Sequence, residues 1–71
     1  MKQLFQIRIA RLHLISGKPE LALKSVEAIK ESVYAASLEE IRGDAQMALG
    51  KRELASQSYV KALTALDEAA P

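Results

Sequence analysis

A six-residue segment occurs twice in the chain, 33 residues apart, and it constrains the fold more than any other feature of the sequence. Residues 17–22 read Gly-Lys-Pro-Glu-Leu-Ala and residues 50–55 read Gly-Lys-Arg-Glu-Leu-Ala, so five of the six positions are identical. A period of this length is typical of helical repeat proteins, in which each unit is one helix–turn–helix pair. We therefore predict two such units, with each copy of the segment at the turn between the two helices of its unit.

The composition narrows the class of function. The 71 residues include ten Lys and Arg and nine Asp and Glu, and the formal net charge of +1 provides no basic patch for nucleic acid. There is no cysteine, which excludes a disulfide framework and a thiolate site. No stretch approaches the roughly 18–20 uninterrupted apolar residues of a membrane span. Arg8, Arg11 and His13 interrupt any signal-peptide core near the N-terminus.

Apolar periodicity predicts four helices and no strand. Gly17 and Gly50 are expected to end the first and third helices, because glycine readily takes the positive φ that follows a helix C-terminus. Pro19 suits the first turn of the second helix. Ser32 is expected to be the N-cap of the third helix. The expected ranges are 3–16, 19–31, 33–49 and 51–68.

Each helix carries an apolar stripe that we expect to be packed, and the first helix carries two, which suits a helix packed on two sides. Gly43 lies in the middle of the third helix, where glycine costs about 1 kcal/mol against alanine. We therefore expect another helix to approach closely at Gly43. The stripes are Phe5, Ile9, Leu12 and Ser16, and Leu4, Ile7, Leu14 and Ile15, in the first helix; Ala22, Val26 and Ile29 in the second; Tyr34, Leu38, Ile41, Ala45 and Ala48 in the third; and Leu54, Ala55, Tyr59, Ala62, Leu63 and Leu66 in the fourth.

The order of small and aromatic residues resembles the tetratricopeptide repeat (TPR): a small residue in the first helix, glycine at the turn, alanine early in the second helix, then an aromatic and a small residue. In the second unit these positions hold Gly43, Gly50, Ala55, Tyr59 and Ala62. In the first unit they hold Ala10, Gly17, Ala22, Val26 and Ile29, which is a looser match. The tryptophan usual in the first helix is absent, as is the proline that usually closes a unit. The resemblance implies an all-α fold in which one TPR-like domain spans residues 1–71, with repeats at about residues 3–32 and 33–68.

A closer resemblance covers most of the chain. The runs at residues 7–12, 17–23 and 41–45 are similar to the C-terminal part of the YfgM-type ancillary subunits of the bacterial SecYEG translocon. Members of that family carry a transmembrane helix and a periplasmic TPR-like domain. The resemblance implies that the chain is the last two repeats of such a domain, without the anchor. It also implies a position on the periplasmic side of a bacterial inner membrane, with the translocon or periplasmic chaperones as protein partners.

The candidate partner-binding surface lies on the first helix of each unit. In TPR arrays these helices line a concave groove, and the alignment directs Arg8 and Arg11 toward it. A groove with arginines and apolar side chains suits an extended segment or a helix of a partner protein. The alternative is that Arg8 or Arg11 pairs with Glu40 or Asp44 between adjacent helices, with little net value for stability. The whole predicted surface is Ile7, Arg8, Arg11, Leu14, Ile15, Glu40, Asp44 and Met47.

No pattern predicts catalysis, a metal site or a cofactor. His13 is the single histidine, lies on a polar face and is expected to be solvated. Arg42, at a position where the family usually has leucine, is expected to make an interhelical or edge contact. No serine has a base within a recognisable motif, and the isolated glycines form no phosphate loop.

The sequence therefore predicts a non-catalytic protein-interaction module. A cytosolic TPR adaptor is the alternative within that class, and a small helical regulatory or enzymatic domain dependent on His13 is the alternative outside it. Two repeats are fewer than the roughly three that a helical array needs to bury its faces. We therefore expect the chain to self-associate through the apolar edges of its terminal helices.

Overall fold

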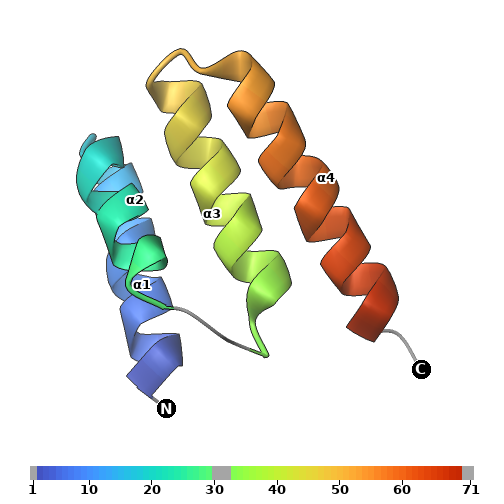
Figure 1. Ribbon diagram of the computed structural model, residues 1–71. Coiled ribbons are helices and arrows are strands. Elements are labelled where there is room, and N and C mark those ends of the chain that lie inside the picture. Colours follow the sequence, from blue (N-terminus) through green and yellow to red (C-terminus); the bar gives the residue numbers. More distant parts are fainter. Residues whose placement is uncertain (1, 30–32, 70–71) are drawn as a thin grey trace.

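Two helix–turn–helix pairs make up the fold (Figure 1). The computed structural model of the chain describes residues 2–29 and 33–69. Within these ranges no strand occurs, and consecutive helices run in opposite directions. This confirms the predicted all-α architecture of two helical repeats. The helices are α1 (Lys2–Ile15), α2 (Pro19–Glu27), α3 (Ala35–Ala48) and α4 (Arg52–Ala69).

Both turns within the pairs have the geometry that the repeated segment predicts. Gly17 has φ +75° and Gly50 has φ +78°, each just after the helix that it ends. In each turn two backbone N–H groups donate back to carbonyls near the end of the helix. These carbonyls would otherwise have no hydrogen-bond partner. The bonds are Lys18 to His13 (2.7 Å) and Gly17 to Leu14 (3.1 Å) in the first turn, and Lys51 to Gln46 (2.8 Å) and Gly50 to Met47 (3.0 Å) in the second.

Replacing either turn glycine with alanine is expected to lower the free energy of unfolding by about 1 kcal/mol, the cost of holding an L-residue in the left-handed region. No heavy atom lies within 4 Å of a Cβ built at Gly17 or Gly50, so the backbone conformation alone determines this cost. Urea denaturation of Gly17→Ala and Gly50→Ala measures it. Gly17→Asn is the control and should cost less, because asparagine tolerates this region. Equal stability of Gly17→Ala and the wild-type chain would contradict the expectation.

The connection between the two pairs differs from the prediction. α2 ends at Glu27, whereas the sequence predicted residue 31. The Ile29 N–H donates to the Val26 carbonyl at 3.1 Å in a tight turn, and the Ile29 side chain still reaches the core. α3 begins at Ala35 rather than at residue 33, and Tyr34 occupies the N-cap position without a side-chain cap. The predicted N-cap, Ser32, lies outside the described residues.

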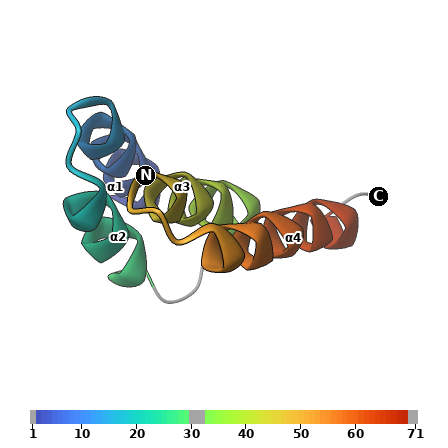
Figure 2. The ribbon, with the colours of Figure 1, turned by 90° about the horizontal axis from the view of Figure 1, so that it is seen from above.

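The hydrophobic core lies where α3 packs against both helices of the first pair. Figure 2 shows α3 between that pair and α4. Ile41 and Val26 are the largest of the fully buried side chains. Burial of these residues stabilises the contact between the two repeats. The buried members of the core are Ile7, Ala10, Ala22, Val26, Ile29, Leu38, Ile41 and Ala45.

The second pair is held by small residues. A Cβ built at Gly43 would lie 2.5 Å from Cε1 of Tyr59, far inside van der Waals contact, so that only glycine leaves room for the ring. This confirms the close approach predicted at Gly43. Beside it, the buried Ser58 hydroxyl donates to Oε1 of Gln46 at 2.7 Å.

Some apolar residues predicted to be packed are instead exposed. On α1, Phe5 and Leu12 are exposed, so this helix is packed on one side rather than two. Ile9, which belongs to the same predicted stripe, is half-buried and lines an open groove with Ser25 and Ala28 of α2, the other helix of its pair. The other exposed members of the predicted stripes are Ile15, Ser16, Ala48, Leu54, Leu63 and Leu66.

Candidate protein-binding surface

One surface spans α1 and α3 and carries most of the predicted binding residues. We call it the inner-helix face. It combines basic, acidic and apolar side chains on two neighbouring helices, all of them exposed except Arg11, which is half-buried. Its residues are Arg8, Arg11, Ile15, Glu40, Asp44 and Met47.

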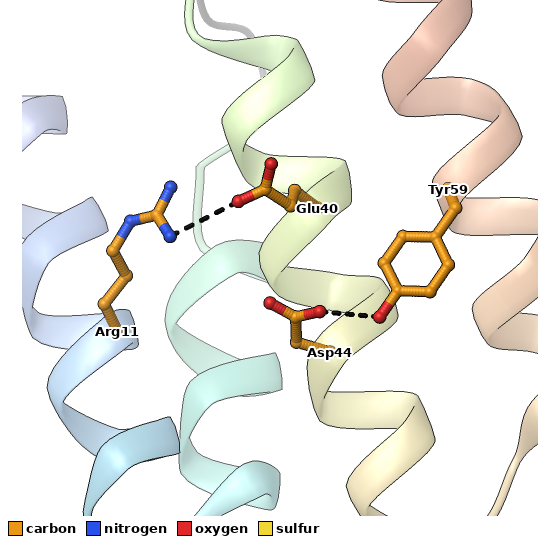
Figure 3. A network of polar contacts seen from close by, with 4 residues as sticks. All are labelled: Arg11, Glu40, Asp44 and Tyr59. Carbon is orange, nitrogen blue, oxygen red and sulfur yellow. Dashed lines mark hydrogen bonds and ion pairs between the residues drawn. The ribbon is translucent and has the colours of Figure 1, made fainter.

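Arg11 bridges the two helices of this face. Its Nη1 lies 3.4 Å from Oε1 of Glu40 (Figure 3). The two side chains are 43% and 55% exposed, so solvent screens the pair, and its net contribution to stability is at most about 1 kcal/mol. Arg8 is exposed and has no ion-pair partner among the described residues. The structure therefore contains one of the pairings that the sequence suggested and leaves the Arg8 charge open to a partner.

Asp44 is held from the other side, by α4. The Tyr59 hydroxyl donates to Oδ1 of Asp44 at 2.6 Å (Figure 3). This bond to a carboxylate raises the pKa of Tyr59 to about 12, and burial and the negative charges of Asp44 and Glu40 add to the effect. From the sequence, Tyr59 was predicted only as a core residue. The sequence feature that could have indicated this hydrogen bond was Gly43, because a glycine there lets the Tyr59 ring cross α3 next to Asp44.

The Tyr59 hydrogen bond is expected to make stability fall in strong base. Because the folded state holds the proton more tightly, the stabilisation is present below the ordinary pKa of 10.0 and is lost as pH rises toward about 12. Urea midpoints measured across that pH window follow this loss of stability. Tyr59→Phe is the reference, because it removes the Tyr59 hydroxyl and keeps every other titratable group. We expect the wild-type midpoint to fall more steeply than that of Tyr59→Phe. Parallel curves would contradict the assigned bond.

Of the predicted surface residues, one is buried in the core and a second is half-buried against it. Ile7 is 3% exposed and is a member of the core, so it cannot contact a partner, and we remove it from the candidate surface. Leu14 is half-buried and packs against the same core. The reason is geometric: the predicted binding face of α1 borders the face that packs into the core shared with α2 and α3, and Ile7 falls on the packed side.

Comparison with known proteins decides the family. The profile of the tetratricopeptide repeat-like domain family matches residues 1–70. The chain belongs to this family. TPR-like domains generally mediate protein–protein interactions and are typically not enzymes. No match was found among curated proteins or among solved structures.

The remaining polar features of this TPR-like chain lie away from the inner-helix face. Arg42 forms an ion pair with Glu39 one turn away in the same helix, α3, at 2.9 Å, instead of the interhelical or edge contact expected for it. The pair lines an open groove of about 450 Å³ between α3 and α4. His13 is half-buried rather than fully solvated. Among the described residues no three His, Cys, Asp or Glu side chains gather as a metal site, and no helix is long and apolar enough to cross a membrane.

Proposed function

We propose that the chain is a non-catalytic module that binds another protein across its inner-helix face. The observation that carries the proposal is that the open Arg8 and two exposed apolar side chains, Ile15 and Met47, lie on helices fixed by a shared core. Arginine and methionine are enriched where proteins meet, and charge is best tolerated there at the rim. A rigid surface of this kind loses little conformational freedom when a partner binds.

The chemistry of the face indicates the kind of segment it would accept. Ile15 and Met47 offer apolar contacts, Arg8 offers a cation, and Asp44 offers an anion one helix away. An amphipathic helix or an extended segment with apolar side chains and both signs of charge complements these groups. The ion pair between Arg11 and Glu40 lies between the two helices and includes neither Arg8 nor Asp44.

We propose a periplasmic setting, on a bacterial inner membrane, with the Sec translocon or a periplasmic chaperone as partner. Support comes from the resemblance of residues 7–12, 17–23 and 41–45 to the YfgM-type translocon subunits. A cytosolic TPR adaptor is the other candidate, since the family match applies equally to both.

Titrating the fluorescently labelled chain with purified SecYEG in lipid nanodiscs tests the setting and the surface together. We expect saturable binding that Ile15→Asp weakens several-fold. The control is Val60→Asp, the same kind of change at an exposed position of α4 outside the inner-helix face, which should leave the affinity unchanged. Absence of binding would contradict the translocon setting. Binding that both variants affect equally would contradict the surface.

A further inference from the structure

The open groove between α3 and α4 is a surface separate from the inner-helix face. Its volume is about 450 Å³, and none of the residues that line it belongs to the inner-helix face. At about 100° per residue, its α3 side lies about 100° or more around the helix from Glu40 and Asp44. The proposed function therefore does not involve this groove. It is lined by Glu39, Arg42 and Gln46 on α3 and by Leu54, Gln57, Ser58 and Lys61 on α4.

The first repeat has a groove at the same register that carries no charge. This groove lies between α1 and α2 and has a volume of about 210 Å³. The two helices of a repeat thus form the groove with charged or with uncharged walls. The three charged side chains of the second groove are not needed to pair α3 with α4, so binding can account for them. The residues of the first groove are Gln6, Ile9, Ser25 and Ala28, which lie 33 positions before Glu39, Arg42, Ser58 and Lys61.

A buried serine positions a hydrogen-bond donor in the second groove. Ser58 is 4% exposed, and its hydroxyl donates to Oε1 of Gln46 at 2.7 Å. Because the amide oxygen of Gln46 accepts this bond, its NH2 group keeps both hydrogens for another acceptor. That NH2 group makes no hydrogen bond to the part of the chain that the structure describes. The groove therefore holds an oriented donor that a ligand can use.

The charged side chains add further donors and leave a net positive charge. Nε of Arg42 donates to Oε1 of Glu39 at 2.9 Å, so these two charges neutralise each other. The outer nitrogens of Arg42, Nη1 and Nη2, have no partner among the described residues. Lys61 is exposed and forms no ion pair within residues 2–29 and 33–69. The free charge of the groove is therefore that of the Lys61 ammonium group.

The groove has a cationic end and an apolar end. α3 and α4 run antiparallel with Gln46 bonded to Ser58 (Figure 1), so one turn further from Gln46 Arg42 lies level with Lys61. Leu54 is 45% exposed and precedes Lys61 by seven residues, on the same side of α4. At 1.5 Å per residue, the two ends are about 10 Å apart along the helix axis.

We infer that this groove binds an acidic side chain of another protein, with an apolar residue of the same segment against Leu54. The carboxylate accepts hydrogen bonds at the cationic end, where Arg42, Gln46 and Lys61 supply donors. This is a second site, for a protein other than the partner of the inner-helix face. The inference does not depend on the identity of that partner.

The charge of the groove favours a carboxylate over a phosphate group. A carboxylate carries one negative charge, which matches the single free charge of Lys61. A phosphate group carries about −1.5 to −2 at neutral pH and would place the excess beside Glu39. A nucleic acid would need several free cations along its backbone, and this groove offers one.

The distance between the two ends predicts the spacing within the bound segment. A polyproline II helix repeats its side-chain direction every three residues and rises about 3.1 Å per residue, which gives about 9 Å per turn. An apolar residue three positions from an aspartate or glutamate therefore reaches both ends of the groove from one side of such a segment. We expect the occupant to be an extended segment with this spacing.

An NMR titration of the isotope-labelled chain with a synthetic peptide tests the inference. The probe is acetyl-Ala-Ala-Leu-Pro-Pro-Glu-Ala-Ala-amide, in which the glutamate carries the only charge and the prolines favour polyproline II. We expect saturable shifts of the side-chain NH2 signals of Gln46 and Gln57 as the peptide is raised to about 5 mM. The same peptide with Gln in place of Glu should bind about fivefold more weakly, the value of one partly exposed ion pair.

Two substitutions test which groups hold the carboxylate. Lys61→Glu reverses the free charge, and Gln46→Glu keeps the oxygen that accepts from Ser58 but removes the NH2 donor. Each should weaken binding about fivefold or more. The matched control is Lys18→Glu, the same change of charge at an exposed position before α2, outside the groove, and it should leave the affinity unchanged.

The outcomes separate the parts of the inference. Absence of shifts at the highest peptide concentration, or shifts confined to the inner-helix face, would overturn the site. Equal affinity for the Glu and Gln peptides would overturn the carboxylate as its ligand. Equal effects of Lys61→Glu and Lys18→Glu would reduce the binding to the overall charge of the chain and overturn the assigned contacts. None of these outcomes bears on binding at the inner-helix face, because the titration contains no other protein.

Discussion

Gly43→Leu is expected to lower the free energy of unfolding by about 3 kcal/mol or more, at the upper end of the cost of overpacking. Even a single Cβ at this position would lie 2.5 Å, 2.7 Å and 2.9 Å from three ring carbons of Tyr59. A leucine cannot fit unless α4 moves away from α3 or the ring leaves its place over Asp44. Either movement also breaks the hydrogen bond from the Tyr59 hydroxyl.

Urea denaturation followed by circular dichroism measures this loss. A domain of this size has a total stability of roughly 4–10 kcal/mol, so the variant should keep only about 1–7 kcal/mol and its urea midpoint should fall clearly. Ala48→Leu is the control, because Ala48 is exposed on the same helix and leucine is a good helix former. Removing the ring with Tyr59→Ala should make the cost of Gly43→Leu smaller. An unchanged midpoint for Gly43→Leu would show that α3 and α4 do not approach each other at this point.

Ile41→Ala should cost about 3 kcal/mol, within the range found for truncating a large buried aliphatic residue. Ile41 is 0% exposed and lies at the centre of the contact through which α3 packs on both helices of the first repeat. The cavity would be surrounded by the side chains of three helices that are already close-packed, so it could collapse only in part. The lost stability therefore comes from the contact that holds the two repeats together.

The matched control is Ile15→Ala, which deletes the same atoms from a side chain that is 82% exposed. Its free energy of unfolding should stay within about 0.5 kcal/mol of the wild-type value, as for surface substitutions in general. Thermal melts of both variants measure the difference. If Ile41→Ala and Ile15→Ala had equal effects, the core would not lie between α3 and the first repeat.

The architecture could be predicted from the sequence because local signals determine it. Gly17 and Gly50 end helices through their positive φ, and their 33-residue spacing fixes the repeat. Gly43 could be assigned a close helix contact because a glycine inside a helix has a cost that packing must offset. The helix ends and the contact at Gly43 needed only a residue and its near neighbours in the chain, whereas the repeat needed a comparison of two segments 33 residues apart.

The details that the sequence did not predict depend on which elements pack around each helix. The first helix carries enough apolar residues for two packed sides, but α2 and α3 share one core with it, and Phe5 and Leu12 remain exposed. Ile7 was assigned to the binding surface because its position on the helix borders that surface, although it is buried in the core that α1 shares with α2 and α3. The bond between Tyr59 and Asp44 joins residues 15 positions apart on different helices, and only the three-dimensional arrangement shows it.

Site-specific photo-crosslinking tests the central claim, that a protein partner binds across the inner-helix face. A photoreactive phenylalanine analogue is placed at Ile15 or Met47, exposed positions of the inner-helix face on α1 and α3, and, as controls, at Lys24 or Gln57, exposed positions on α2 and α4. Purified SecYEG in nanodiscs is the probe, and the wild-type chain in excess is the competitor. The account predicts adducts from Ile15 and Met47 that the competitor removes, and none from Lys24 or Gln57. Adducts that form only at Lys24 or Gln57, or equally at all four positions, would contradict it.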